Sequence, residues 1–222
     1  EGEFTLYEAL ASKGYVTGHF GKWHMGTLTR KMKDSNRGAK SLSNYSPPWQ
    51  HAVKTTFATE AKTPTYDPMW QPSIEKGKKK NDFTLGDFRG PSRQGWYAMS
   101  QNTDREFYGT HYWTDKETFI DPASEELLGD DSDLIMERAL SFIDEHHENP
   151  FLAVVWFHAP HLPCVASKED TDKYAASDPK LDGLHLNYYG CVTALDRAVG
   201  KLRARIRPVY YTHLTLPTTY HV

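Results

Sequence analysis

Residues 150–163 read PFLAVVWFHAPHLP, and this stretch decides the fold. Its first part, residues 151–157, is a continuous apolar run of strand length, which is typical of a parallel strand buried on both faces. The second part, from His158 to Pro163, holds two histidines among prolines and predicts a stiff polar loop. The sequence therefore places histidines just beyond the carboxyl end of a buried strand.

Helical patterns lie on both sides of this strand. Before it, the acidic group at residues 130–133 can cap a helix and faces the positive end of the helix dipole. Apolar residues then follow at helical spacing to about His147. After the strand, a helix of about twenty residues ends in a basic turn near residue 206. Its apolar positions are Val192, Leu195, Val199, Leu202 and Ile206.

The N-terminal part predicts a helix, a strand and a loop in that order. Residues 5–13 have apolar positions at helical spacing, and Gly14 stands where a glycine ends such a helix. Residues 15–20 predict a strand, and the glycine-bounded residues 21–26 predict the loop that leaves it. Helices that alternate with buried strands indicate an α/β layered sheet.

The middle of the chain is poor in periodicity. Residues 28–110 are rich in prolines and other turn formers, so we expect a long irregular insertion. The lysine-rich run at residues 76–80 is interpreted as a solvated loop and is assigned no chemistry.

Composition excludes several classes of protein. The 222 residues carry a net charge of −3, so no global field recruits nucleic acid or an anionic membrane. The longest apolar run falls short of the roughly 18 residues that a membrane span needs. Residues 1–4 include neither a start methionine nor a leader, so location cannot be read from them. Cys164 and Cys191 allow one disulfide, although the sequence favours two buried free thiols.

Two polar clusters follow the predicted strands, where ligands of α/β sheets bind. Lys22 and His24 are two residues apart on a segment expected to be extended, so their side chains should share a face. His161 follows the second strand and can add another donor. One lysine and two histidines form a compact cationic pocket for a tetrahedral oxyanion. A histidine of near-neutral pKa could also pass a proton to a leaving alkoxide.

The two clusters also allow other interpretations. His158 and His161 could instead be structural, bonded to backbone carbonyls, and the spacing alone leaves this open. A zinc site lacks a nearby carboxylate or thiol to complete the ligands. A P-loop fails because Trp23 stands where Ser or Thr is needed. No G-x-S-x-G elbow supports a serine triad.

At this point three blocks resemble the sulfatase family, in the family's order. Residues 5–26 look like the second sulfatase signature, residues 150–163 resemble the strand and histidine loop, and residues 188–202 resemble the following helix. The resemblance implies an alkaline-phosphatase-like three-layer α/β sandwich, incomplete here. Residues 1–206 would be a partial catalytic domain with the insertion at 28–110. Residues 207–222 match nothing expected of the family, and we interpret them as a foreign or truncated tail.

The resemblance also implies a function, the hydrolysis of sulfate esters, with carbohydrates as the expected substrates. The family uses a cysteine oxidised to formylglycine, installed by a formylglycine-generating enzyme, and a calcium ion. The Cys-x-Pro-x-Arg motif and the calcium ligands belong outside residues 1–222, so the chain alone is expected to be inactive and to expose apolar sheet edges. A periplasmic, secreted or lysosomal location is implied by resemblance. Alternatives are a phosphodiester or phosphonate ester hydrolase of the same superfamily and a non-catalytic binding protein.

By position in the family, three residues of this chain would act at the sulfate. Lys22 would contact the formylglycine and the sulfate, and His24 would help the sulfated hydrate collapse to the aldehyde. His161 would contact the sulfate and assist the leaving alcohol. His158 does not take that place and is interpreted as a pocket-wall or structural residue. No metal ligand is assigned within the chain.

Overall fold

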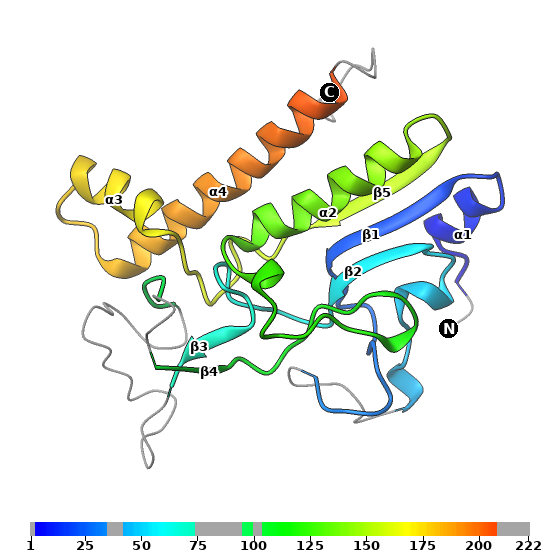
Figure 1. Cartoon of the computed structure of the whole chain (residues 1–222), viewed down its shortest axis with the longest axis horizontal. Coiled ribbons are helices and arrows are strands. Elements are labelled where there is room, and N and C mark those ends of the chain that lie inside the picture. The colour runs from blue at the N-terminus through cyan, green and yellow to red at the C-terminus, as the bar shows by residue number, and fades with distance from the viewer. Residues whose placement is uncertain (1–2, 35–41, 74–94, 100–103, 208–222) are drawn as a thin grey trace, which may run out of the picture.

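A parallel sheet forms the centre of the protein, in a computed structural model that describes residues 3–34, 42–73, 95–99 and 104–207. Strand β1 (Val16–Lys22) lies between β2 (Thr55–Thr59) and β5 (Phe151–Trp156), and both neighbours run parallel to it (Figure 1). The predicted strands at 15–20 and 151–157 are thereby confirmed to within two residues. Strand β2 lies inside the segment that was expected to have little regular structure.

Helices lie on both faces of this sheet. The predicted helix α2 (Asp131–His146) covers one face, where Phe142 packs against Phe20 of β1, and α4 (Gly183–Ile206) packs against α2. The short α1 (Leu6–Ala11) lies on the other face, where the Tyr7 hydroxyl bonds His19. Since residues 19 and 20 of a strand point to opposite faces, the arrangement has three layers. The predicted α/β class is confirmed.

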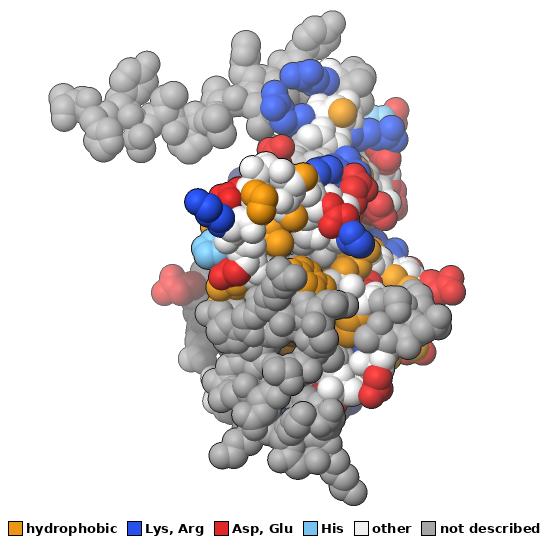
Figure 2. Space-filling view, turned by 90° about the vertical axis from the view of Figure 1, so that its left-hand side faces the viewer, with side chains coloured by type: hydrophobic (Ala, Val, Ile, Leu, Met, Phe, Trp, Pro, Cys, Tyr) orange, Lys and Arg blue, Asp and Glu red, His pale blue; other side chains and the backbone are white. Residues whose placement is uncertain are grey.

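The remaining elements lie beside this core. Helix α3 (Lys168–Ser177) packs on α4 and was not predicted. Strands β3 (Trp70–Pro72) and β4 (Arg105–Phe107) form a separate antiparallel pair. Figure 2 shows charges of both signs intermixed on the face formed by α3 and α4, which agrees with a nearly neutral chain. In the part of the chain that the structure describes there are also four short 3₁₀ helices, which are Leu42–Asn44, Pro48–Gln50, Asp115–Glu117 and Glu125–Leu127.

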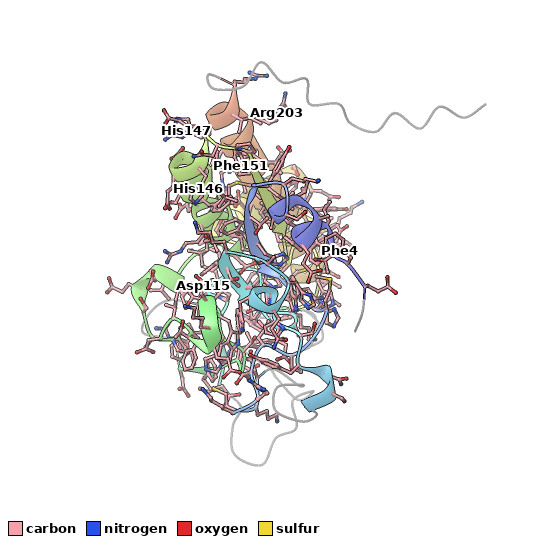
Figure 3. All side chains as sticks on the ribbon, turned by 90° about the vertical axis from the view of Figure 1, so that its right-hand side faces the viewer. Phe4, Asp115, His146, His147, Phe151 and Arg203 are labelled. Carbon is pink, nitrogen blue, oxygen red and sulfur yellow. The ribbon has the colours of Figure 1, made fainter. Side chains whose placement is uncertain are left out.

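The start of α2 follows the predicted capping pattern. The Asp130 carboxylate accepts hydrogen bonds from the backbone N–H groups of Ser132 and Asp133, at 2.9 and 3.3 Å. Burial, with the neighbouring Asp131 carboxylate, raises the pKa of Asp130 to about 7. At the far end of α2, Phe142 contacts His146 and Phe151 (Figure 3).

Strand β5 is half-buried, so the prediction that it is buried on both faces is wrong. It forms an edge of the described sheet, and Trp156 is 41% exposed. Because α1 covers β1 and leaves part of β5 open, an apolar groove of about 520 Å³ lies beside α1. Its lining includes Leu6, Tyr7, Trp23, Met25, Val154 and Trp156. Leu6, Met25 and Trp156 of this lining are exposed, whereas Tyr7 and Trp23 are buried.

The structure leaves several sequence predictions untested. The lysine run at 76–80 and nearly all of the tail at 207–222 lie outside the described residues. Among the helices that the structure describes, none is long and apolar enough to cross a membrane.

Candidate functional site

The carboxyl ends of the three parallel strands bring the predicted site segments to one edge of the sheet. Lys22 ends β1 opposite Thr59 of β2, and Gly21 lies opposite Trp156 of β5. The chain stays attached to β2 beyond the strand, because the Trp23 N–H donates to the Thr59 carbonyl oxygen at 2.9 Å. The loop that carries Lys22 and the loop after β5 therefore leave the sheet side by side.

His24 departs from the predicted geometry. Its φ is +54°, in the left-handed region, so the prediction that residues 22–24 are extended is wrong. The rule that places alternate side chains on one face does not apply to this turn. Its backbone N–H donates to the Glu60 carbonyl oxygen at 3.1 Å, and its side chain is exposed, whereas Lys22 is half-buried. The convergence of Lys22 and His24 on one anion stays a prediction.

His158 is a structural residue of this edge. Its Nε2 lies 2.6 Å from Thr59 Oγ1, and its Nδ1 lies 2.7 Å from Asp131 Oδ2. The other oxygen of Asp131 accepts a hydrogen bond from the Tyr112 hydroxyl. All four side chains are buried. This network ties the end of β5 to β2 and to the start of α2. Of the two interpretations of His158, pocket wall or structural residue, these bonds favour the second.

His161 lies on the same loop but faces outward. Its backbone N–H donates to the His158 carbonyl oxygen at 2.7 Å, so the buried network also fixes the turn that carries it. The side chain is exposed, and Nδ1 donates to the Leu162 carbonyl oxygen at 2.7 Å. Since a carbonyl can only accept, this bond places a proton on Nδ1 and leaves Nε2 to exchange one.

Two buried residues that support the first loop were missed by sequence reasoning. His19 of β1 accepts from the Tyr7 hydroxyl at Nδ1, at 2.7 Å, and its Nε2 lies 3.2 Å from the Lys22 carbonyl oxygen. Burial lowers the pKa of His19 to about 4 and keeps its ring neutral. Glu60, also fully buried, accepts from the Leu28 N–H at 3.1 Å. A histidine inside the predicted strand and a glutamate in the segment expected to be irregular give no sign of either role in the sequence.

The donor set at this edge does not fit a calcium ion. Calcium takes six to eight oxygen ligands, whereas the predicted site supplies an ammonium and imidazoles. The nearby Asp131 already uses both oxygens on His158 and Tyr112. Among the residues described by the structure, no three His, Cys, Asp or Glu side chains are grouped to hold a metal. These side chains therefore suit an anion better than a calcium ion.

Comparisons with known proteins agree with this architecture. Ps i-CgsB in complex with k-i-k-neocarrahexaose is 20% identical, with a TM-score of 0.57 over 91% of this chain and 36% of that one. The Bacteroides thetaiotaomicron protein BT33494S-sulf, from work on the metabolism of multiple glycosaminoglycans, is 15% identical, with a TM-score of 0.53 over 93% of this chain and 39% of that one. At these identities the likeness shows the fold.

The chain thus spans less than half of these solved chains. A search of the curated proteins finds no match. A sequence model of the sulfatases matches residues 1–211, which is nearly the whole chain. By that match and its fold, the chain belongs to the sulfatase family.

Proposed function

We propose that this chain carries the sulfate-binding part of an enzyme that hydrolyses sulfate esters. The supporting observation is that the Lys22 loop and the His161 loop leave adjacent parallel strands, in a chain of the sulfatase family. A sulfate group needs positive charge and hydrogen-bond donors from a fixed frame. The buried His158 network and the backbone bonds to β2 supply that frame.

Each site residue has a separate role in this proposal. The Lys22 ammonium neutralises a sulfate oxygen and holds the ester in place. His161, with Nδ1 held by the Leu162 carbonyl oxygen, donates a proton from Nε2 to the leaving alcohol. After this transfer the ring is neutral and keeps the same backbone bond. If the whole protein carries the formylglycine of the family, His24 would be placed to exchange a proton with it.

We further propose that the ester is on a carbohydrate. Ps i-CgsB is described in complex with an oligosaccharide, and BT33494S-sulf comes from work on glycosaminoglycans. Formylglycine, its generating enzyme and calcium are carried over from the family resemblance alone. The chain spans 36–39% of these two chains, so the activity proposed is that of the whole protein.

Sulfate titration of the isolated chain tests the anion site without any need for turnover. We expect the ring signals of His24 and His161 to shift in NMR spectra as sodium sulfate is added. Lys22→Gln should weaken the binding about tenfold or more, because a charge-assisted hydrogen bond contributes about 1.5–3 kcal/mol. Lys168→Gln is the matched control, since Lys168 is an exposed lysine that pairs with Asp172 on α3. Equal binding by both variants would count against the site.

Turnover by the full-length protein separates the candidate functions. We expect p-nitrophenyl sulfate to be hydrolysed, and His161→Gln to lower kcat most for substrates with poor leaving groups, which need a proton. Faster cleavage of bis-p-nitrophenyl phosphate would favour the phosphodiesterase alternative. Binding of sulfate without turnover of either ester would favour a non-catalytic binding protein.

A further inference from the structure

The two cysteines, far apart in the sequence, lie together in the fold. Cys164 follows the loop that carries His161, and Cys191 lies in the third turn of α4. Both are free and fully buried in this structure, as the sequence favoured. They form one small buried cluster with Ala159, against which Leu195 packs.

The backbones on either side of the two cysteines are also held together. The Ala166 N–H donates to the Asn187 side-chain oxygen at 2.9 Å, so the segment after Cys164 is attached to α4 one turn before Cys191. Gly190 permits this approach, because a Cβ added there would lie 2.5 Å from the Cβ of Ala166. The segment after Cys164 therefore packs directly on the backbone of α4 next to Cys191.

The thiols themselves interact. The two thiols lie in the same buried cluster, and their interaction lowers the pKa of Cys164 and raises that of Cys191. Each thiol also lies near a backbone carbonyl oxygen: Cys164 Sγ is 3.4 Å from that of Pro160, and Cys191 Sγ is 3.2 Å from that of Tyr188. These contacts hold both sulfur atoms inside one small buried apolar cluster.

We propose that Cys164 and Cys191 form an intramolecular disulfide that ties the loop carrying His161 to α4. A small-molecule disulfide such as oxidised glutathione is the oxidant. The Cys164 thiolate attacks one of its sulfurs and releases one glutathione thiolate, and the Cys191 thiolate then attacks Cys164 Sγ and releases the second. Two cysteine thiols are oxidised, one glutathione disulfide is reduced to two thiols, and the two protons go to the released glutathione.

Burial determines when this exchange takes place. Because neither sulfur is accessible in the folded chain, the oxidant reacts during folding or when the loop after β5 opens. Once formed, the bond closes a loop from residue 164 to residue 191. A disulfide that stabilises the fold is in turn favoured by the fold. The ratio of disulfide to dithiol should therefore be roughly a hundredfold higher in the folded chain than in the unfolded chain, in line with the usual stabilisation by such a bond.

Equilibration of the whole chain with glutathione buffers of defined ratio tests this proposal. Samples are kept either in native buffer or in guanidinium, quenched with acid, alkylated and measured by mass spectrometry. We expect the native chain to lose the mass of two hydrogen atoms and to give a peptide that joins the two cysteines. The ratio of disulfide to dithiol should be roughly a hundredfold higher in native buffer than in guanidinium.

Single-cysteine variants provide the control. Cys164→Ser and Cys191→Ser should each keep one thiol that reacts with the alkylating agent, and neither should lose hydrogen. The proposal is overturned if native and denatured chains give the same ratio, whatever the cause, because the fold would then not bring the thiols together. It is equally overturned if the wild-type chain forms glutathione adducts or intermolecular dimers in place of the internal bond.

Discussion

The buried His19 should make the stability of the protein depend on pH. Its ring is neutral, with one nitrogen bonded to the Tyr7 hydroxyl and the other to the Lys22 carbonyl oxygen, and burial lowers its pKa to about 4. In the unfolded chain its pKa is about 6.5. The unfolded state therefore binds more protons between these values. The stabilisation is fully present above about pH 6.5 and is lost as the pH falls toward 4.

The size of this effect follows from the shift in pKa. A change of about 2.5 units corresponds to about 3 kcal/mol, and nearly all of it should be lost by about pH 4. Asp130 acts in the opposite direction, because its raised pKa of about 7 makes the folded state more stable as the pH falls. The pH dependence of the wild-type free energy of unfolding therefore contains the contributions of both His19 and Asp130. The difference between the wild type and His19→Gln isolates the histidine, since Asp130 is present in both.

Urea unfolding of both proteins across this pH range is the assay. The difference in free energy of unfolding between the wild type and His19→Gln should decrease by about 3 kcal/mol from about pH 7.5 to pH 4. Tyr7→Phe is the matched control, because it removes the partner at Nδ1 and keeps a ring that can titrate. A loss from His19→Gln that stays constant over the range would refute the argument. So would a ring that NMR shows to titrate near pH 6.5 in the folded chain.

Two further pairs of substitutions test the packing of the sheet and of the helix that covers it. Gly21→Ala should lower the free energy of unfolding by at least about 3 kcal/mol, because φ is +104° and the new Cβ would lie 2.0 Å from the Trp156 carbonyl oxygen. Gly14→Ala, at φ +85° with open space around it, should cost about 1 kcal/mol, and equal losses would contradict the contact. Ile135→Ala in the core should cost about 3 kcal/mol in urea unfolding. Leu140 is half-buried, so Leu140→Ala should cost less than half of that. A larger loss from Leu140→Ala than from Ile135→Ala would contradict this position of the core.

The elements that the sequence predicts are those with strong periodic patterns. Helix α2 has an acidic cap and apolar residues at helical spacing, and β5 is an unbroken apolar run. Strand β2 is missed because its residues, TTFAT, are mostly threonine and stand among turn formers. Helix α3 has charged residues through most of its length and too few apolar positions to show a face. Local pattern therefore predicts the core elements and misses those that tertiary contacts stabilise.

The candidate site shows the same division more sharply. The sequence places Lys22, His24 and His161 at strand ends, because each follows a strand whose pattern is clear. It does not predict the left-handed backbone of His24, since this conformation is stabilised by a bond to the Glu60 carbonyl oxygen, which is distant in sequence. Long-range bonds of this kind leave no periodic signal.

The buried polar residues beneath the site determine how precisely it can act. Without support, the exposed His161 side chain would adopt many rotamers on a mobile loop. Either kind of motion would impair the proton transfer that we propose for it. Here its backbone is bonded to His158, whose ring is held by Thr59 and Asp131 from two other elements. A buried polar network is stable when every member has its hydrogen-bond partner, and removal of one member destabilises the fold because its partners are left unpaired. Loss of Asp131 should therefore disturb His161 as strongly as a change in the loop itself.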